Sequence, residues 1–190
     1  MTFFPSLPED ATVFHVWNAQ PEIYAPLARV TQAIMRNDSP LTPGERELIA
    51  SYVSGLNACQ YCAGGHAAAA EAFGIDEGFL GRLLEDVEAS GVDEKLAPML
   101  AYVNKLTLTP ARMTQADADA VYAAGWDEKA LHDAIAVCCM FNFMNRLVDG
   151  HGVEANPEVF KERGQRHRDL GYLDQYPDLQ EWERKRQAAE

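Results

Sequence analysis

Apolar residues recur along most of this chain at the three- and four-residue spacing of α-helices. The clearest run follows Thr42-Pro43-Gly44-Glu45, where a threonine cap, a proline at the first helical position and a glutamate three residues after the cap are typical of a helix N-terminus. The apolar positions after this start lie on one helical face: Leu48, Ile49, Tyr52, Val53 and Leu56. We expect this helix to break at Asn57, which we interpret as the cap of the next helix.

The same spacing predicts helices over most of the remaining chain. We expect a helix over residues 59–73 that ends at Gly74, and one capped by Asp76 that reaches residue 90 before Gly91. Further helices are expected over residues 21–37, 95–108, 114–123 and 127–148. The sequence lacks alternating runs rich in Val, Ile and Thr. We therefore predict an all-α domain, with two similar helical hairpins opened by the weakly similar segments 45–50 and 127–132.

Composition and charge restrict the classes of function. The chain has 190 residues, of which 47% are hydrophobic, and this predicts a single domain with a sizeable core. A net charge of −13 argues against a phosphate-binding surface, so we expect no nucleic-acid partner. No apolar stretch is long enough to cross a bilayer, and residues 1–10 lack the pattern of a signal peptide. We expect a cytoplasmic protein without membrane contact, whose four cysteines are reduced, catalytic or metal-bound rather than structurally bridged.

The segment Cys59-Gln60-Tyr61-Cys62-Ala63-Gly64-Gly65-His66 carries the most specific chemistry in the chain. In a helix, Cys59, Cys62 and His66 share one face, so the two thiols can form a disulfide and one thiol can reach the imidazole. A thiol in the first turn, where we place Cys59, has a lowered pKa. Glu47, on the preceding helix, is positioned to orient His66 or to relay its proton. Gly64 and Gly65 leave room for a close approach by a helix or a substrate.

Three interpretations of these residues compete. The first, which we favour, is a redox or peroxidatic centre without an organic cofactor. The second is a Zn²⁺ site with Cys59, Cys62, His66 and Glu47 as ligands, because zinc accepts thiolate, imidazole and carboxylate groups. The third is that both cysteines are packing residues. A c-type haem is not expected, because the histidine does not directly follow the second cysteine.

Other residues with reactive or polar side chains have structural explanations. We expect Cys138 and Cys139, which lie in an apolar run, to pack in the core. Arg146 and Asp149 have the spacing of an ordinary ion pair, and Asn142 and Asn145 are candidates for a buried polar network beside the cysteine helix. We interpret His151 as a surface or capping residue, and Trp126, Phe141 and Phe143 as core residues. No partner spacing is evident for the three remaining histidines, His15, His132 and His167.

Two segments together resemble a known family. Glu47 followed by Asn57-x-Cys59-x-Tyr61-Cys62-x-x-x-His66, and the later run Phe141-Asn142-x-x-Asn145-Arg146-x-x-Asp149-Gly150, are similar to the AhpD-like alkylhydroperoxidases of the carboxymuconolactone decarboxylase superfamily, and closest to its peroxidase-related group. The resemblance covers residues 20–155, so residues 1–19 and 156–190 are expected to be flanking arms that pack over the helices or reach a neighbouring subunit. It implies an all-helical fold that assembles into dimers, trimers or hexamers.

The resemblance also implies roles for the site residues. Cys62 matches the cysteine that attacks the peroxide, Cys59 matches the resolving thiol, and His66 and Glu47 match the proton-relay pair. The expected partners are a small peroxide substrate and a dithiol or protein reductant. AhpD itself has a second histidine where this chain has Tyr61, and decarboxylases of the superfamily lack the cysteine pair. A non-catalytic zinc-binding or stress-interaction protein, and a decarboxylase or isomerase that uses His66 and Glu47 as acid and base, remain the alternative functions.

Overall fold

The computed structural model describes residues 2–188 of the chain, and within this range its regular structure is entirely helical. This confirms the all-α prediction. The α-helices are α1 (Val13–Ala19), α2 (Pro21–Arg36), α3 (Pro43–Leu56), α4 (Gln60–Ala72), α5 (Phe79–Glu85), α6 (Ala97–Leu108), α7 (Gln115–Ala123), α8 (Glu128–Gly150), α9 (Phe160–Leu170) and α10 (Pro177–Gln187). Two short 3-10 helices, η1 (Pro110–Arg112) and η2 (Pro157–Val159), precede α7 and α9. None of the described helices is long and apolar enough to span a bilayer.

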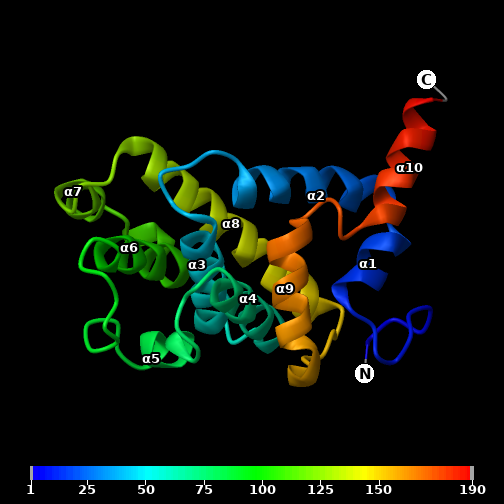
Figure 1. Ribbon diagram of the computed structural model, residues 1–190, viewed down its shortest axis with the longest axis horizontal. Coiled ribbons are helices and arrows are strands. Elements are labelled where there is room, and N and C mark those ends of the chain that lie inside the picture. Colours follow the sequence, from blue (N-terminus) through cyan, green and yellow to red (C-terminus); the bar gives the residue numbers. More distant parts are fainter. Residues whose placement is uncertain (1, 189–190) are drawn as a thin grey trace.

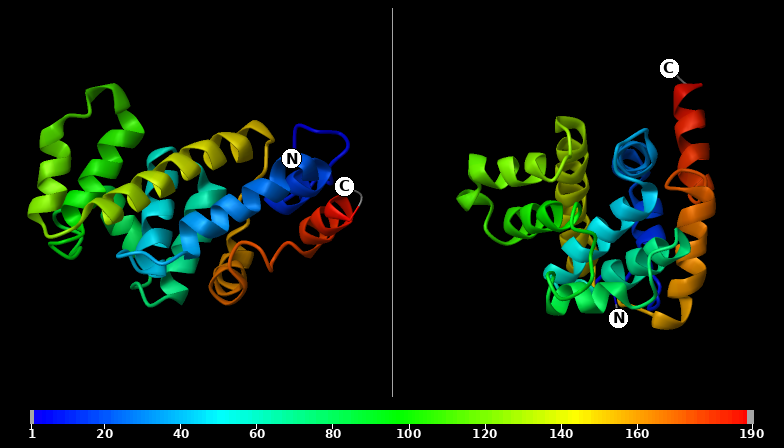
Figure 2. Two further views of the ribbon diagram at one scale, coloured as in Figure 1. Left: turned by 90° about the horizontal axis from the view of Figure 1, so that it is seen from above. Right: turned by 60° about the vertical axis from the view of Figure 1, so that its left-hand side comes forward.

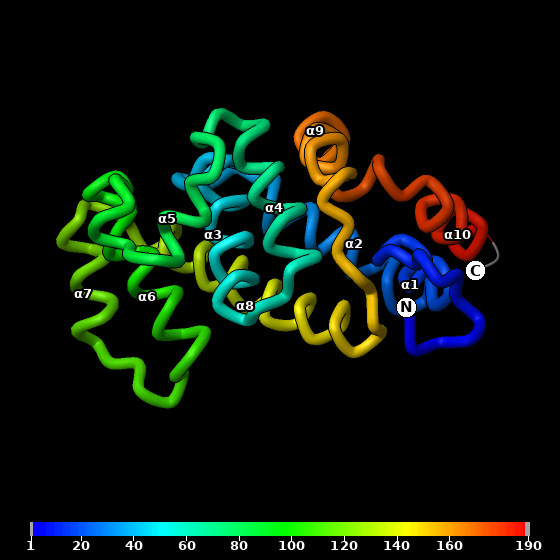
Figure 3. Tube along the Cα trace, turned by 90° about the horizontal axis from the view of Figure 1, so that it is seen from below, coloured from blue at the N-terminus to red at the C-terminus, as the bar shows by residue number. Residues whose placement is uncertain are grey.

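Helices α3 and α4 form the centre of the molecule, where they pack against each other (Figure 1). Helix α8 packs on α3 and α6, and α9 packs on the outer side of α4 (Figures 1 and 3). Helices α5, α6 and α7 lie at one end of the molecule, whereas α1 and α10 lie at the other, as the green segments and the blue and red segments show (Figures 2 and 3). The cysteine helix α4 therefore lies between the central helix α3 and helix α9.

Helix α3 begins as the sequence predicts. The Thr42 hydroxyl accepts a hydrogen bond from the Glu45 N–H at 3.2 Å, and the Glu45 carboxylate accepts one from the Thr42 N–H at 2.7 Å. This capping box satisfies two backbone donors that the first turn leaves unpaired. The helix is buried on all sides from Arg46 to Ser54, which is typical of a helix at the centre of a bundle. Its buried face carries Glu47 into the core.

The start of α4 differs from the prediction. Asn57 ends α3 instead of capping α4, and Cys59 itself is the N-cap residue of α4. Between them Ala58 has a positive φ of 57°, a conformation that costs an L-residue about 1 kcal/mol and turns the chain sharply. The Asn57 side chain cannot cap α4 because it donates hydrogen bonds to Asn142 at 3.1 Å and to Asn145 at 2.9 Å. The turn therefore fixes Cys59 against α8.

Helix α5 is shorter than the predicted 76–90 segment and is capped by Gly78 rather than Asp76. It ends at Glu85 because the next residue, Asp86, accepts hydrogen bonds with its side chain from the N–H groups of Glu88 and Ala89. Such an aspartate turn competes with helical hydrogen bonding.

Both flanking segments contain helices that the apolar pattern did not predict, namely α1, α9 and α10. Helix α9 packs closely on α4 through glycines. A Cβ atom on Gly164 would overlap the backbone of Ala68, and one on Gly64 would overlap the Phe160 ring. A Cβ on Gly65 would lie 3.0 Å from the Arg163 guanidinium. The predicted close approach at Gly64 and Gly65 is therefore made by a helix of this chain.

Candidate active site

Glu47 and His66 form a buried hydrogen-bonded pair between α3 and α4. The Glu47 Oε2 atom lies 2.7 Å from His66 Nδ1, and the Glu47 side chain is fully buried. Arg36 of α2 donates to Glu47 Oε1 at 2.5 Å, and the Tyr172 hydroxyl lies 3.0 and 3.1 Å from the two carboxylate oxygens. The carboxylate thus has a donor from each of three separate segments, which is the pairing that a buried charge requires.

These partners determine the protonation of the pair. Burial opposes the charge on Glu47, but the hydrogen bond and charge of His66, together with Arg36, lower the pKa of Glu47 to about 2. Burial, assisted by the charges of Arg163 and Arg36, lowers the pKa of His66, although the hydrogen bond and charge of Glu47 oppose this change. His66 is therefore neutral at pH 7 and donates through Nδ1 to the carboxylate. Its Nε2 atom is left as a proton acceptor.

The two cysteines of the motif are adjacent, buried and unbridged. A hydrogen bond from the Cys59 thiol lowers the pKa of Cys62; burial opposes this change, and the charge of Arg163 and a hydrogen bond from Asn145 assist it. The same hydrogen bond to Cys62, together with burial, raises the pKa of Cys59. The expectation that Cys59 has the lowered pKa is therefore wrong. Cys59 caps the helix while Cys62 lies within its first turn, where the helix dipole also favours an anion.

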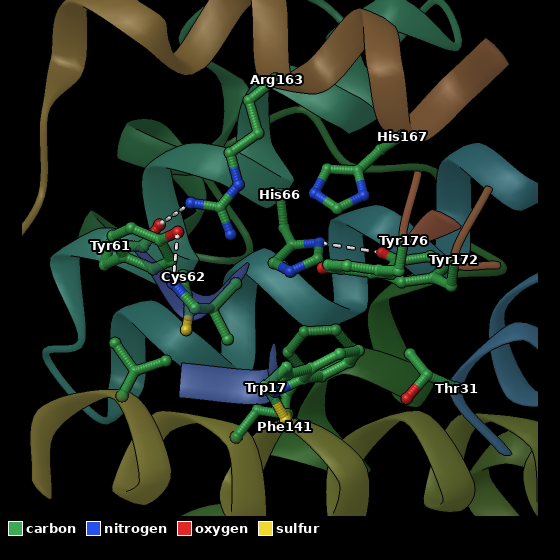
Figure 4. Close-up of a pocket in the computed structure, with 13 residues that line it drawn as sticks. Trp17, Thr31, Tyr61, Cys62, His66, Phe141, Arg163, His167, Tyr172 and Tyr176 are labelled. Carbon is green, nitrogen blue, oxygen red and sulfur yellow. Dashed lines mark hydrogen bonds between the residues drawn. The ribbon is translucent and has the colours of Figure 1, made fainter. Parts of the chain in front are cut away.

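Cys62 and His66 line a small pocket (Figure 4). Its cavity volume is about 20 Å³, which is enough for one water-sized molecule. Phe141 forms part of the wall with its ring edge-to-face with His66 at a centroid distance of 4.4 Å. The other lining residues are Val13, Trp17, Thr31, Tyr61, Met144, Val148, Arg163, His167, Tyr172 and Tyr176. The wall is mostly apolar, so the thiol is shielded from bulk water.

The C-terminal segment supplies one side of this pocket. Arg163 and His167 are four residues apart on α9 and reach down toward Cys62 and His66 (Figure 4). The Arg163 guanidinium lies 4.0 Å from the centre of the Tyr61 ring, and the His167 ring stacks on His66 at 5.2 Å. Tyr172 follows α9 and reaches Glu47. The sequence analysis did not find these residues, and the only signal available was the four-residue spacing of Arg163 and His167.

The predicted polar network beside the cysteine helix is present. Asn57 donates to both Asn142 and Asn145, and Asn145 donates to Ser54 Oγ at 2.9 Å. The expected ion pair between Arg146 and Asp149 is not formed, because Arg146 instead donates to the backbone and side-chain oxygens of Asn142. The network joins α8 to the turn that carries Cys59.

The remaining candidates divide between confirmed and wrong predictions. Cys138 is buried as expected, but Cys139 is exposed because it points from the outer face of α8. His151 caps α8, with Nδ1 2.7 Å from the Leu147 carbonyl oxygen, as expected. Trp126 and Phe141 are buried, whereas Phe143 is 48% exposed.

The geometry argues against Glu47 as a zinc ligand. Both oxygens of Glu47 already accept hydrogen bonds from Arg36, His66 and Tyr172. Within residues 2–188, no group of three or more His, Cys, Asp and Glu side chains converges as metal ligands would.

Comparisons with known proteins identify one family model and several solved structures that are similar to this chain. The model of the carboxymuconolactone decarboxylase family matches residues 21–103, which contain the whole cysteine motif and Glu47. The fold resembles that of an uncharacterized peroxidase-related protein from Silicibacter sp. TM1040, with 26% identity over 78% of each chain and a TM-score of 0.73. It also resembles an uncharacterized peroxidase-related protein with an alkylhydroperoxidase AhpD core from Ralstonia eutropha JMP134, with 24% identity over 80% of each chain and a TM-score of 0.74. No curated protein matches the sequence.

These matches confirm the resemblance that the motifs indicate. The chain resembles the AhpD-like proteins of the carboxymuconolactone decarboxylase family over residues 21–103, and its fold is similar to that of two peroxidase-related proteins.

Proposed function

We propose that this protein is a thiol-dependent peroxidase that reduces a peroxide through Cys62 and Cys59. The observation that carries the proposal is the position of Cys62. Its thiol has a lowered pKa and lines the same pocket as His66. The Nδ1 atom of His66 is hydrogen-bonded to Glu47, which leaves Nε2 as the proton acceptor. A thiol, a second thiol and a proton acceptor are the groups that such a reaction requires.

In the first step Cys62 gives its proton to His66 Nε2, and Glu47 stabilises the imidazolium that forms. The Cys62 thiolate then attacks one oxygen of the peroxide. An S–O bond forms as the O–O bond breaks, so sulfur is oxidised to a sulfenic acid and the peroxide is reduced. The leaving oxygen takes the proton back from His66 and departs as an alcohol or as water.

In the second step the Cys59 thiol attacks the sulfenic acid of Cys62. The S–S bond forms, the S–O bond breaks and the oxygen leaves as water. The adjacency of the two sulfurs supports this step, because closing the disulfide requires little movement. A dithiol or a protein reductant then returns the pair to two thiols and is itself oxidised. We propose a homo-oligomer in the cytoplasm as the working form.

The shape of the pocket suggests how the substrate lies. The inner pocket has room for a peroxide group but not for a large organic tail. An outer cavity of about 330 Å³ shares four lining residues with it: Val13, Tyr61, Arg163 and Tyr176. We place the organic part of the substrate in this outer cavity, with these four side chains between it and the thiol.

The test is single-turnover oxidation of the fully reduced protein. One equivalent of hydroperoxide is expected to oxidise the wild-type pair to a disulfide, seen by free-thiol titration and by the mass of the Cys59–Cys62 peptide. Cys62→Ser is expected to lose peroxide consumption altogether. Cys59→Ser is expected to consume one equivalent and to stop at a sulfenic acid on Cys62, which a dimedone adduct reports.

Cys138→Ser is the matched control, because Cys138 is also buried but lies outside the pocket. Its consumption of peroxide should equal that of the wild type. Undiminished turnover by the Cys62→Ser protein would exclude the mechanism and leave the acid–base chemistry of His66 and Glu47 as the alternative.

A further inference from the structure

The orientation of the Gln175 side chain determines which ring nitrogen of His167 carries the proton. The Gln175 side-chain nitrogen donates to the Gly171 carbonyl oxygen at 2.6 Å, which identifies this atom as the amide NH₂ group. The same nitrogen lies 3.1 Å from His167 Nδ1, so Nδ1 must accept the hydrogen bond. Burial and the neighbouring charges of Arg163 and Arg36 keep His167 neutral, with a pKa well below its usual value. The remaining ring proton therefore lies on Nε2.

This Nε2–H group has no partner within the described part of the chain. His167 is 2% exposed, and its Nε2 atom is among the few buried polar atoms without a hydrogen bond. Native proteins pair the great majority of such groups, so an unpaired donor in a pocket points to a ligand. The ring lines the same pocket as Cys62 and His66 and stacks on His66 (Figure 4).

We propose that His167 is a substrate-binding residue whose Nε2–H donates a hydrogen bond to the peroxide, on the oxygen that leaves when Cys62 attacks. The ligand class is a neutral hydroperoxide, whose oxygens are acceptors. This inference rests on the proposed peroxidase function and assigns one further contact to it.

The chemistry of the step explains the value of a neutral donor at this position. When the S–O bond forms and the O–O bond breaks, negative charge collects on the departing oxygen before His66 returns the proton. A fixed donor in a pocket shielded from water stabilises this charge without reorganisation. Because His167 is neutral, it adds no positive charge beside His66. It therefore does not oppose the imidazolium that forms on His66 and that Glu47 stabilises.

The test compares two reactions of the reduced protein: oxidation by a hydroperoxide, and alkylation of Cys62 by iodoacetamide followed by peptide mass analysis. His167→Phe keeps an aromatic ring stacked on the His66 ring and removes the Nε2–H donor. We expect oxidation to slow by roughly 10²-fold, the scale for loss of one such donor. Alkylation should change far less, because it has no departing peroxide oxygen.

Two amide variants separate the donor from the ring. His167→Gln places an amide N–H near the position of Nε2 and should restore oxidation to within roughly tenfold of wild type, whereas the shorter His167→Asn should not. The comparison of the Gln and Asn variants also tests the proposal by itself if the His167→Phe protein fails to fold. His132→Phe, at an exposed position of α8, is the control for the substitution itself.

The outcomes are distinct. Selective slowing of oxidation in the Phe and Asn variants, with recovery in the Gln variant, supports the proposal. Equal loss of oxidation and alkylation, unaltered oxidation, or a Gln variant as slow as the Asn variant would overturn it while leaving the thiol mechanism intact. A wild-type protein that hydroperoxide does not oxidise overturns both this inference and the proposed function.

Discussion

Glu47 shows how one buried residue can depend on several distant parts of a sequence. Its carboxylate accepts hydrogen bonds from Arg36, His66 and Tyr172, which come from α2, α4 and the segment after α9. The pattern of apolar positions gives no sign that a charge lies at the centre of α3. The chain can hold this charge because every donor around it is supplied by side chains that are themselves packed.

Replacing Glu47 by Gln is expected to slow peroxide reduction by roughly 10²-fold, the lower part of the range for acid–base catalysis. An amide nitrogen beside His66 Nδ1 would donate instead of accept, which moves the ring proton to Nε2 and removes the acceptor that Cys62 needs. Single-turnover oxidation rates measure the effect. Glu45→Gln is the control on the same helix, because a glutamine also completes a capping box; equal slowing in both variants would argue against the relay.

Among the individual residues, the sequence identified those with a specific local pattern. The sequence predicted that Cys59, Cys62, His66 and Glu47 lie close together, because their spacing places them on helix faces that can meet. His167 was not found, because its partner atoms belong to Gln175 and Gly171, and its place in the pocket depends on how α9 docks. The pKa order of the two thiols was also missed, because it depends on the hydrogen bond between them and on Arg163.

At the level of helices, predictability follows the strength of the local signals. Helix α3 has a complete capping box, and the end of α4 at Ala72 is followed by Phe73 and the positive-φ residue Gly74; both of these boundaries were predicted closely. Helix α9 has the sequence Phe-Lys-Glu-Arg-Gly-Gln-Arg-His-Arg-Asp-Leu, which lacks an apolar stripe. Its buried positions are Gly164 and His167, so it docks through backbone contact and polar side chains that periodicity cannot reveal.

The docking of α9 provides a test at this scale. A methyl group at Gly164 would overlap the backbone of Ala68, so Gly164→Ala is expected to lower the free energy of unfolding by about 1–3 kcal/mol, the cost of overpacking. The same variant should slow peroxide oxidation, because α9 carries Arg163 and His167. Urea unfolding and single-turnover kinetics measure the two effects.

Gly81→Ala in α5 is the matched control. A Cβ atom there meets nothing within 4 Å, and its backbone is helical, so alanine should stabilise the protein by about 0.4–1 kcal/mol. If Gly164→Ala were as stable and as active as Gly81→Ala, the close contact between α4 and α9 would not exist in solution.

For the whole molecule, the buried site predicts how stability depends on pH. The pKa values of His66 and His167 are lowered in the folded chain, so below pH 6.5 the unfolded chain binds more protons and stability falls. The slope for each group reaches about 1.4 kcal/mol per pH unit. Glu47 acts in the same direction at lower pH, since its pKa is about 2 in the folded chain and near 4.5 when unfolded.

The urea midpoint, measured at one protein concentration between pH 7.5 and 5, is therefore expected to fall steadily below pH 6.5. His167→Gln removes one of the two histidines and should flatten the decline. A midpoint that stays constant across this interval, or a decline of the same steepness in the variant, would contradict the buried neutral state of these rings.

The thiol pair and the helix that covers it, α9, are far apart along the sequence, and this distance determines when the site can form during translation. Cys62 leaves the ribosome about a hundred residues ahead of Arg163 and His167. Until α9 docks, a nascent chain carries both sulfurs without the guanidinium and imidazole that line the finished pocket. We therefore expect the site to mature only after α9 has been synthesised and has docked. Products that terminate before residue 160 should retain the cysteine motif but react with peroxide no faster than ordinary thiols.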